Sequence, residues 1–366
     1  MSYRIILVNN YYNSHTIGLV DEFYKQTNGN FLALETSTIE EFRKKIGWKP
    51  IERVYIDKYE NHIDDVLNAD VVIYGGSNID KILSERIQSG KLTFFVTERP
   101  YKIPTTKSTY IKRLVGSYLH FGRYQKDNLY LLAQGGYVKE DMKLFHNFKG
   151  RILKWGYFPL MTSNINKKEN KIPQITWCGR MLDWKHPEDA INVAKYLIEH
   201  NVLFHMDIIG SGDLYEEIEK QVEPLKEFVS IMPSISNEEM QNKLDETDLL
   251  LVTSDRYEGW GAIVNEGMYH KCIVLCNKLI GSGTYLIQDK QNGYLYASTE
   301  ELCSLSLYII NHLRELNIVS NKAHDTINNE WNYSVAVERM LKWSDSYLNK
   351  EQIEFTDGIM SKDDYE

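Results

Sequence analysis

Short runs of apolar and β-branched residues alternate along this chain with longer stretches in which apolar residues recur every three or four positions. This alternation is typical of βαβ units, in which helices connect parallel strands. It predicts strands at 4–8, 31–34, 71–74, 92–96, 129–132 and 152–155, and then at 175–178, 205–209, 229–232, 249–253 and 273–276. The sequence therefore predicts an α/β protein built on parallel sheets.

A polar stretch without any period, residues 161–173, separates the two groups of strands and is typical of a linker. At roughly 150 residues per domain, a chain of 366 residues is long enough for two domains. We therefore place one domain at 1–160 and a second at 174–335. A helical segment at 336–350 follows, and we expect the acidic tail at 351–366 to be frayed.

The charge balance narrows the class of partner. The chain has 42 basic and 51 acidic residues, so its net charge of −9 argues against nucleic acid as a partner. No apolar run reaches the roughly 18 residues of a membrane-spanning helix, and the chain enters a strand-like run directly, so we expect a cytoplasmic protein. Its four cysteines form no C-x-x-C pair, and we interpret them as reduced core residues.

The segment 253–268 carries the densest chemistry. It follows an apolar strand and opens a helix, which would direct the backbone N–H groups around Gly261, Ala262 and Ile263 toward an anion such as phosphate. Glu258 precedes this helix and Glu266 lies inside it. The two carboxylates could therefore flank one ligand and accept hydrogen bonds from its hydroxyls.

Two further loops follow strands of the second half. One carries Arg180 and Lys185, five residues apart, and two cations at this spacing could neutralise a diphosphate leaving group. The other is rich in glycine, with Gly210 and Gly212 separated by one residue, which suits close approach of the backbone to a ligand.

A G-R-x4-K loop, a G-x-G turn and an E-G-x-G-x4-E stretch, in this order, resemble the nucleotide-binding domain of retaining GT-B glycosyltransferases. The likeness is to the large family of bacterial polysaccharide and glycolipid enzymes called glycosyl transferases group 1. It implies two Rossmann-like domains that face each other across a cleft, with C-terminal helices returning to the first. The first domain would serve the acceptor, and the second would bind a nucleotide sugar.

The resemblance also implies roles for single residues. Arg180 and Lys185 would bind the donor diphosphate, Glu258 the hydroxyls of the donor sugar and Glu266 those of the ribose. Gly210 and Gly212 would border the base. A UDP-sugar is favoured over a GDP-sugar, and no cofactor or metal ion is expected, because no D-x-D sequence lies in a suitable loop.

The first domain departs from the family pattern. After its first strand, only Gly18 could replace the usual pair of glycines that approaches the donor phosphate, with His15 as a local substitute. Where many relatives carry a histidine after the strand at 92–96, this chain has Glu98 and Arg99. These residues are therefore our candidates for donor or acceptor contacts in the first domain.

Residues 99–126 contain seven basic residues and no acidic ones, in a chain that is acidic as a whole. Within this segment apolar residues recur at helical spacing, namely Ile111, Leu114, Val115, Tyr118 and Leu119. Two interpretations stay open. The stripe either faces the core of the domain, with solvated cations beside it, or meets the inner face of a membrane or a lipid diphosphate acceptor.

The resemblance predicts a retaining, metal-independent glycosyltransferase. It would move a hexose from a nucleoside diphosphate sugar to a hydroxyl of a glycan or lipid-linked acceptor in bacterial cell-surface polysaccharide or glycolipid synthesis. Three alternatives remain: a nucleotide-sugar epimerase with the same fold, a glycan phosphorylase, and a noncatalytic partner of an active glycosyltransferase.

Overall fold

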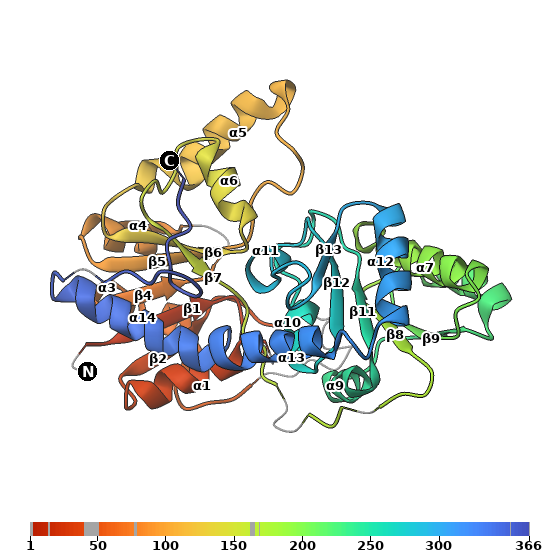
Figure 1. The fold of residues 1–366 in the computed structure, drawn as a ribbon. Helices are drawn as coiled ribbons and strands as arrows, with labels where there is room; N and C mark the ends of the chain where they lie inside the picture. The colour runs from red at the N-terminus through yellow and green to blue at the C-terminus, as the bar shows by residue number, and fades with distance from the viewer. Residues whose placement is uncertain are drawn as a thin grey trace. The chain divides into compact units, whose positions relative to one another are not determined.

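A computed structural model describes residues 3–13, 15–39, 51–76, 79–161, 165–167, 169–351 and 353–365. The chain divides into two compact units (Figure 1). The first consists of Met1–Leu160 and Trp331–Glu366, and the second of Met161–Glu330. Each unit is built on one parallel sheet, of seven strands in the first and six in the second, which confirms the predicted α/β class.

The sheet of the first unit has the order β3-β2-β1-β4-β5-β6-β7, and all its pairs are parallel. Most of its strands are buried along nearly their whole length, because helices cover both faces of a parallel sheet. The short β3 was not predicted, since its three residues are partly exposed and only one is apolar. The strands are β1 (Ile5–Asn9), β2 (Phe31–Glu35), β3 (Ile56–Lys58), β4 (Val71–Tyr74), β5 (Leu92–Thr97), β6 (Leu129–Gln134) and β7 (Ile152–Trp155).

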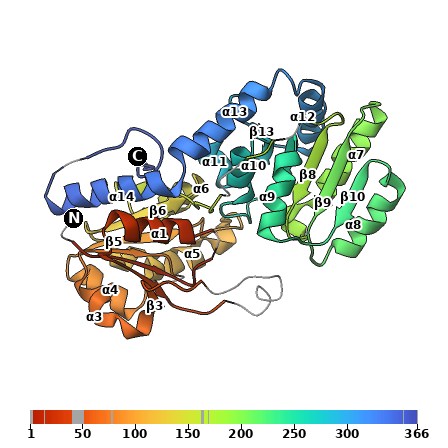
Figure 2. The ribbon, with the colours of Figure 1, turned by 90° about the horizontal axis from the view of Figure 1, so that it is seen from below.

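The first unit takes its last helix from the far end of the chain. Its helices are α1 (Ile17–Gln26), α3 (Ile63–Asn68), α4 (Lys81–Gln88), α5 (Lys107–His120), α6 (Tyr137–Lys143) and α14 (Tyr333–Leu348). In both views α14 lies beside α1 (Figures 1 and 2). A Cβ on Gly18 of α1 would come within 3.0 Å of the Tyr333 ring, so glycine at this position allows the two helices to pack closely.

The C-terminal segment follows the edge strand β7, so our expectation of a frayed tail is wrong. The Lys154 N–H donates to the Ser361 carbonyl (2.9 Å), and the Asp363 N–H donates to the Ile152 carbonyl (3.0 Å). Ile359 next to them is fully buried. An edge strand presents unpaired backbone groups, and this segment satisfies part of them. The segment is therefore an ordered part of the first unit.

The sheet of the second unit has the order β10-β9-β8-β11-β12-β13. Every predicted strand of both halves is confirmed, with ends that differ by at most two residues. Only the three-residue β13 was missed here. The strands are β8 (Gln174–Cys178), β9 (His205–Ile209), β10 (Val229–Met232), β11 (Leu249–Val252), β12 (Ile273–Asn277) and β13 (Tyr294–Tyr296). The helices are α7 (Pro187–Glu199), α8 (Tyr215–Val222), α9 (Asn237–Glu246), α10 (Ile263–Tyr269), α11 (Gly283–Leu286), α12 (Thr299–Asn311) and α13 (Asn317–Asp325).

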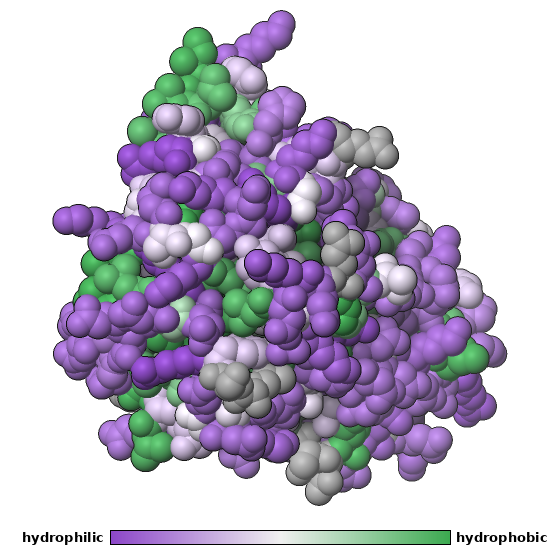
Figure 3. Space-filling view, turned by 90° about the vertical axis from the view of Figure 1, so that its left-hand side faces the viewer, coloured by the Kyte–Doolittle hydropathy of each residue, from purple (hydrophilic) through white to green (hydrophobic). Residues whose placement is uncertain are grey.

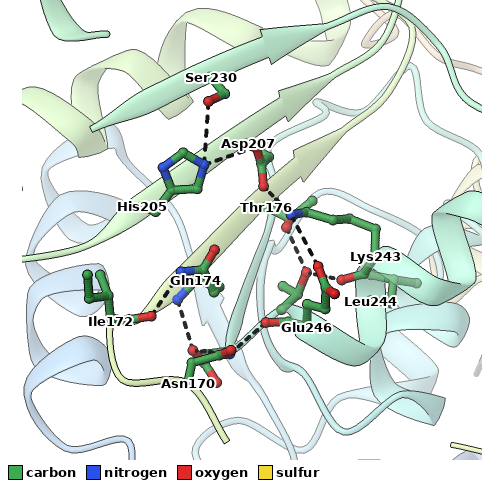
Figure 4. Close-up of polar contacts among 12 residues, drawn as sticks. Asn170, Ile172, Gln174, Thr176, His205, Asp207, Ser230, Lys243, Leu244 and Glu246 are labelled. Atoms are coloured by element: carbon green, nitrogen blue, oxygen red, sulfur yellow. Dashed lines mark hydrogen bonds and ion pairs between the residues drawn. The ribbon is translucent and has the colours of Figure 1, made fainter. Parts of the chain in front are cut away.

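A polar network ties the end of the predicted linker to the second unit where β8 begins (Figure 4). The Asn170 side-chain amide donates to the Asp248 carboxylate (2.9 Å) and to the Glu246 carbonyl (2.7 Å). Nearby, Lys243 of α9 forms an ion pair with Asp207 of β9, which is only 3% exposed. This network stabilises the edge of the sheet that lies opposite the loops following the strands.

Two smaller observations complete the fold. In the described ranges, no helix combines the length and the apolar composition that crossing a membrane requires. All four cysteines have free thiols, and three of them are buried, in agreement with the prediction of reduced core residues.

Candidate functional site

The strand order of the second sheet creates a switch point between β8 and β11. From β8 the chain continues outward to β9 and β10, whereas from β11 it continues in the other direction to β12 and β13. In open α/β sheets, ligands bind outside the carboxyl ends of the strands at such a point. The loop after β8 carries Arg180 and Lys185, and the loop after β11 carries Glu258 and Gly261. The predicted residues of two separate motifs therefore meet at one place.

An ion pair connects these two loops directly. The Lys185 ammonium contacts the Glu258 carboxylate, and each side chain is only 16% exposed. The Thr253 hydroxyl donates to the Lys185 carbonyl (2.6 Å) and accepts a hydrogen bond from the buried Trp177 indole (2.7 Å). Lys185 is thus held both by the hydrogen bond from Thr253 to its carbonyl and by the ion pair of its side chain with Glu258.

A tryptophan that the sequence analysis did not single out lies between the two cations. The Lys185 ammonium is 4.7 Å from the centre of the Trp184 ring, and the Arg180 guanidinium is 5.5 Å from it. At these distances the face of the indole attracts both cations. The Trp184 carbonyl also accepts from the Asp255 N–H of the opposite loop (3.0 Å). An aromatic residue inside the R-x4-K loop was the signal available in the sequence.

The G-x-G turn after β9 serves the neighbouring loop. A Cβ on Gly210 would lie 1.8 Å from the Gly179 carbonyl oxygen, and a Cβ on Gly212 would lie 2.5 Å from the Met181 carbonyl oxygen. The Met181 N–H donates to the Ser211 carbonyl (3.0 Å), so the two loops are paired. The missing side chains of these glycines thus make room for the loop that carries Arg180, and their predicted approach to a ligand stays a prediction.

Glu266 lies inside α10 and is 7% exposed. Burial raises the pKa of this carboxyl from 4.5 to about 7. The Glu266 carboxylate is close enough to Cys178, the last residue of β8, to raise the pKa of that thiol, although burial of the thiol raises it more. A Cβ on Gly267 would come within 2.3 Å of Leu250, so the next residue allows α10 to pack tightly on β11. Glycine at 267 thereby positions Glu266.

The turn before α10 also requires glycine. Gly261 has φ +87°, and a Cβ on it would lie 2.9 Å from the Ile280 side chain. Ala262 caps the helix and Ile263 begins it, so their N–H groups belong to the first turn and have no partner inside the helix. The helix has seven residues, so we regard these groups as supplementary to the charged side chains.

In the first unit, the four predicted residues have different partners. Glu98 follows β5 and accepts a hydrogen bond from the Tyr157 hydroxyl (2.8 Å). Arg99 is buried, lies over the Tyr137 ring and pairs with Asp141 (3.4 Å), so its guanidinium contacts two residues of α6. Gly18 is occupied by its contact with Tyr333.

The loop after β1 contains the fourth predicted residue, His15, whose N–H donates to the Asn13 side chain (2.8 Å). The switch point of this sheet lies between β1 and β4. At the end of β4 the chain carries a pair of glycines, and the Gly75 N–H donates to the Val8 carbonyl of β1 (2.8 Å). This Gly75–Gly76 pair, which the sequence analysis overlooked, lies where a backbone can approach a ligand.

The second unit matches a known family along almost its whole length. Residues 162–329 fit the family model described as glycosyl transferases group 1. The second unit is therefore similar to the domain that defines this family. No curated protein matches the sequence itself.

Several solved structures resemble this protein over nearly the whole chain. One is a glycosyltransferase from Rickettsia africae, with 16% identity and a TM-score of 0.68, covering 95% of this chain and 99% of the other. HepE of Anabaena, in complex with UDP, has 11% identity and a TM-score of 0.67, with coverages of 94% and 100%. The pneumococcal O-GlcNAc transferase GtfA, in complex with UDP and GlcNAc, has 11% identity and a TM-score of 0.63, with coverages of 95% and 100%. At such identities the likeness establishes the fold, which is GT-B.

The basic segment at 99–126 presents its apolar stripe to solvent, so the interpretation of a core-facing stripe is wrong. Ile111 is 73% exposed and Tyr118 is 60% exposed, and of the residues of α5 only Ser117 is buried. Hydrophobic surface gathers at the top of Figure 3, where Figure 1 places α5. Among the described residues of the first unit, no other element packs over this face of α5.

Proposed function

We propose that this protein transfers a hexose from a nucleoside diphosphate sugar, UDP-sugar in preference to GDP-sugar, to a hydroxyl of a glycan or a lipid-linked acceptor. The transfer proceeds with retention and without a metal ion, in the synthesis of bacterial cell-surface polysaccharide or glycolipid. One observation carries the proposal: Arg180, Lys185 and Glu258 meet at the switch point of the second sheet. The UDP held by HepE and by GtfA supports the choice of nucleotide.

The charges at the switch point suit a departing diphosphate. As the bond between the sugar and the phosphate breaks, negative charge accumulates on the phosphate oxygens, and preorganised cations stabilise it. Arg180 and Lys185, both beside Trp184, supply two positive charges. A diphosphate competes with Glu258 for Lys185, which leaves the Glu258 carboxylate available to hydroxyls of the donor sugar. The buried Glu266 then serves the ribose hydroxyls.

Retention sets the geometry of the step. The acceptor oxygen attacks the anomeric carbon on the same face from which the diphosphate leaves. The bond from this carbon to the phosphate oxygen breaks, the bond to the acceptor oxygen forms, and the proton of the acceptor hydroxyl passes to the departing phosphate oxygen. This balance needs no protein nucleophile, and we assign none.

Nucleotide binding is tested by thermal unfolding with UDP, GDP and their sugars. A ligand at 100 times its dissociation constant stabilises the folded protein by about 2.7 kcal/mol. We expect a shift selective for UDP compounds that Glu266→Gln strongly reduces. Glu238→Gln, on the exposed face of α9, is the matched control and should retain the shift. A protein that no nucleotide stabilises would contradict the proposal.

Turnover separates the enzymatic alternatives. Incubation with UDP-glucose and a panel of glycan and lipid-linked acceptors, followed by NMR of the anomeric proton, should show an α-linked product, because the donor is α-linked. Conversion of the donor sugar to its epimer without acceptor would identify an epimerase. Nucleotide binding without any product from the panel would favour the noncatalytic partner.

We further propose that α5 brings the protein to an anionic membrane surface. The exposed stripe is flanked by cations, with Lys107 and Lys112 in the same helix. Amphipathic helices with basic polar faces bind anionic bilayers, and each cation near the surface contributes about 1 kcal/mol. Arg113 is excluded from this count, because it bonds to Thr105 (2.7 Å) and lies over the Tyr101 ring.

Sedimentation with vesicles tests this contact. The protein should pellet with vesicles of phosphatidylglycerol and stay in solution with vesicles of phosphatidylcholine. Lys107→Glu with Lys112→Glu, or Ile111→Ser with Val115→Ser, should each reduce the pelleted fraction at least fivefold. The matched control, Lys195→Glu with Lys220→Glu in the second unit, should pellet like the unchanged protein. Equal sedimentation of all variants would refute the membrane contact.

A further inference from the structure

A second concave site lies in the first unit, beneath the C-terminal segment. It is a cavity of about 230 Å³ whose walls come from β6, the start of β7, α14, Glu351 and residues 353–362. Aromatic rings form much of the wall, and carboxylates lie among them. The residues that the argument uses are Tyr130, Trp343, Tyr347, Phe355, Glu351 and Glu354.

The aromatic rings are held in a fixed arrangement. Trp343 and Tyr347, one turn apart on α14, are nearly parallel, with centres 5.6 Å apart and an angle of 13°. Tyr130 of β6 meets both edge-on, at 4.6 Å and 72° from Trp343 and at 5.8 Å and 86° from Tyr347. Trp343 is anchored on the buried Phe94 (5.4 Å). These rings thus form a rigid corner.

The polar groups of the cavity are acidic on balance. Glu351 and Glu354 contribute two carboxylates, and Lys362 contributes one ammonium, which pairs with Glu354 at 2.5 Å. Both members of this pair are more than half exposed, so the pair lies at the rim and remains open to exchange. The cavity therefore offers hydrogen-bond acceptors next to flat apolar surfaces.

The cavity is distinct from the edge of the sheet where ligands of α/β proteins bind. Tyr130 is the second residue of β6, and Leu153 is the second residue of β7. Both therefore lie near the amino ends of their strands, whereas Glu98 and the Gly75–Gly76 pair follow the carboxyl ends of β5 and β4. A ligand in this cavity would not occupy the switch point of the first sheet.

We infer that this cavity binds a single sugar ring of a glycan. A pyranose ring has apolar C–H faces, which suit the aromatic corner, and hydroxyl donors around its rim, which suit the carboxylates. The volume is below the roughly 300 Å³ at which pockets for drug-sized ligands begin, so it suits one ring and not a longer segment.

This inference rests on the proposed function and extends it to the substrate. A glycan acceptor or product that is held by one ring at the amino ends of β6 and β7 stays attached while its other end is exchanged. Such a second contact raises the effective concentration of the glycan at the enzyme. We therefore expect the cavity to affect the KM for long glycan acceptors more than the KM for single-ring acceptors.

Saturation-transfer NMR on the full chain tests the binding. The probes are methyl α-glucoside, methyl α-galactoside and N-acetylglucosamine, with choline chloride as the rival, because aromatic rings with carboxylates also bind quaternary ammonium ions. At least one sugar should give a signal that Phe355→Ala and Glu351→Gln each reduce at least fivefold. Tyr308→Ala on α12 and Glu140→Gln on α6 are exposed controls that should leave it unchanged. Trp343 is kept, because it packs on the core.

Saturating UDP should not displace the sugar, which distinguishes this cavity from the donor site. Absence of transfer from all three sugars, equal signals in the Phe355 variant, loss of the signal with UDP, or a response to choline alone would each overturn the inference. If this inference is wrong, UDP still shifts the melting temperature. If the proposed function is wrong, UDP causes no such shift. The melting temperature of each variant shows that it remains folded.

Discussion

Titration of Glu266 should make the second unit less stable as the pH rises. Its carboxyl has a pKa of about 7 in the folded protein, against 4.5 when it is exposed to water. Between these values the folded protein holds a proton that the unfolded chain has lost. Stability therefore falls with increasing pH in this window, with the sign opposite to that of a carboxylate in a salt bridge.

The size of the effect follows from the two pKa values. They differ by about 2.5 pH units, and one pH unit corresponds to about 1.4 kcal/mol, so ionisation of Glu266 costs about 3 kcal/mol in all. Roughly three quarters of this falls between pH 5 and pH 8. Glu266→Gln has nearly the same shape and does not titrate. The stability of the unchanged protein should therefore fall relative to that of the variant by about 2 kcal/mol over this range.

Hydrogen exchange of the β8 and β11 amides measures the opening of the second unit itself. Exchange rates, corrected for their intrinsic pH dependence, give the unfolding free energies of the unchanged protein and of Glu266→Gln at pH 5, 6, 7 and 8. Other titrating groups cancel in the difference between them, and Glu238→Gln should behave like the unchanged protein. If the unfolding free energies of the unchanged protein and of Glu266→Gln change equally between pH 5 and pH 8, ionisation of Glu266 does not destabilise the folded protein. Our account of its burial is then wrong.

Three further predictions concern the same unit. UDP-glucose should bind more tightly as the pH rises from 6 to 8, because ribose hydroxyls favour the ionised carboxylate, and Glu266→Gln should remove this dependence in calorimetric titrations. Gly210→Ala places a Cβ 1.8 Å from the Gly179 oxygen and should displace the loop of Arg180, which lowers the affinity for UDP-glucose at least tenfold. The control Gly116→Ala, with open space around it in α5 of the first unit, should instead stabilise the protein by about 0.5–1 kcal/mol. Equal affinities of the two variants for UDP-glucose would refute the steric argument. Lys243→Met removes the ammonium partner of the buried Asp207, which keeps only its contact with His205 (3.2 Å), and should cost about 3 kcal/mol of unfolding free energy in urea titrations. Lys226→Met, whose pair with Glu223 is exposed, should leave the unfolding free energy nearly unchanged, and a similar small loss in both variants would refute the role of the network.

The sequence by itself determined the architecture of the second unit and indicated the residues of its candidate site. Buried parallel strands need apolar side chains on both faces, so each left a compact apolar run, as at Leu249–Val252. The residues of the candidate site follow such strands directly, and loops after parallel strands converge at one edge of the sheet. For this reason Arg180, Lys185 and Glu258 could be selected from spacing and family likeness before any geometry was known.

Only the tertiary structure decided which partners the other residues meet. Gly18 packs on Tyr333, more than 300 positions away, and Gly210 makes room for Gly179, because a missing side chain reveals nothing about what fills its space. The stripe of α5 has the same spacing whether it faces a core or solvent, and only the packing around it shows that it is exposed. The C-terminal segment is held by backbone hydrogen bonds to β7, which depend little on side-chain identity and so leave no pattern in the sequence.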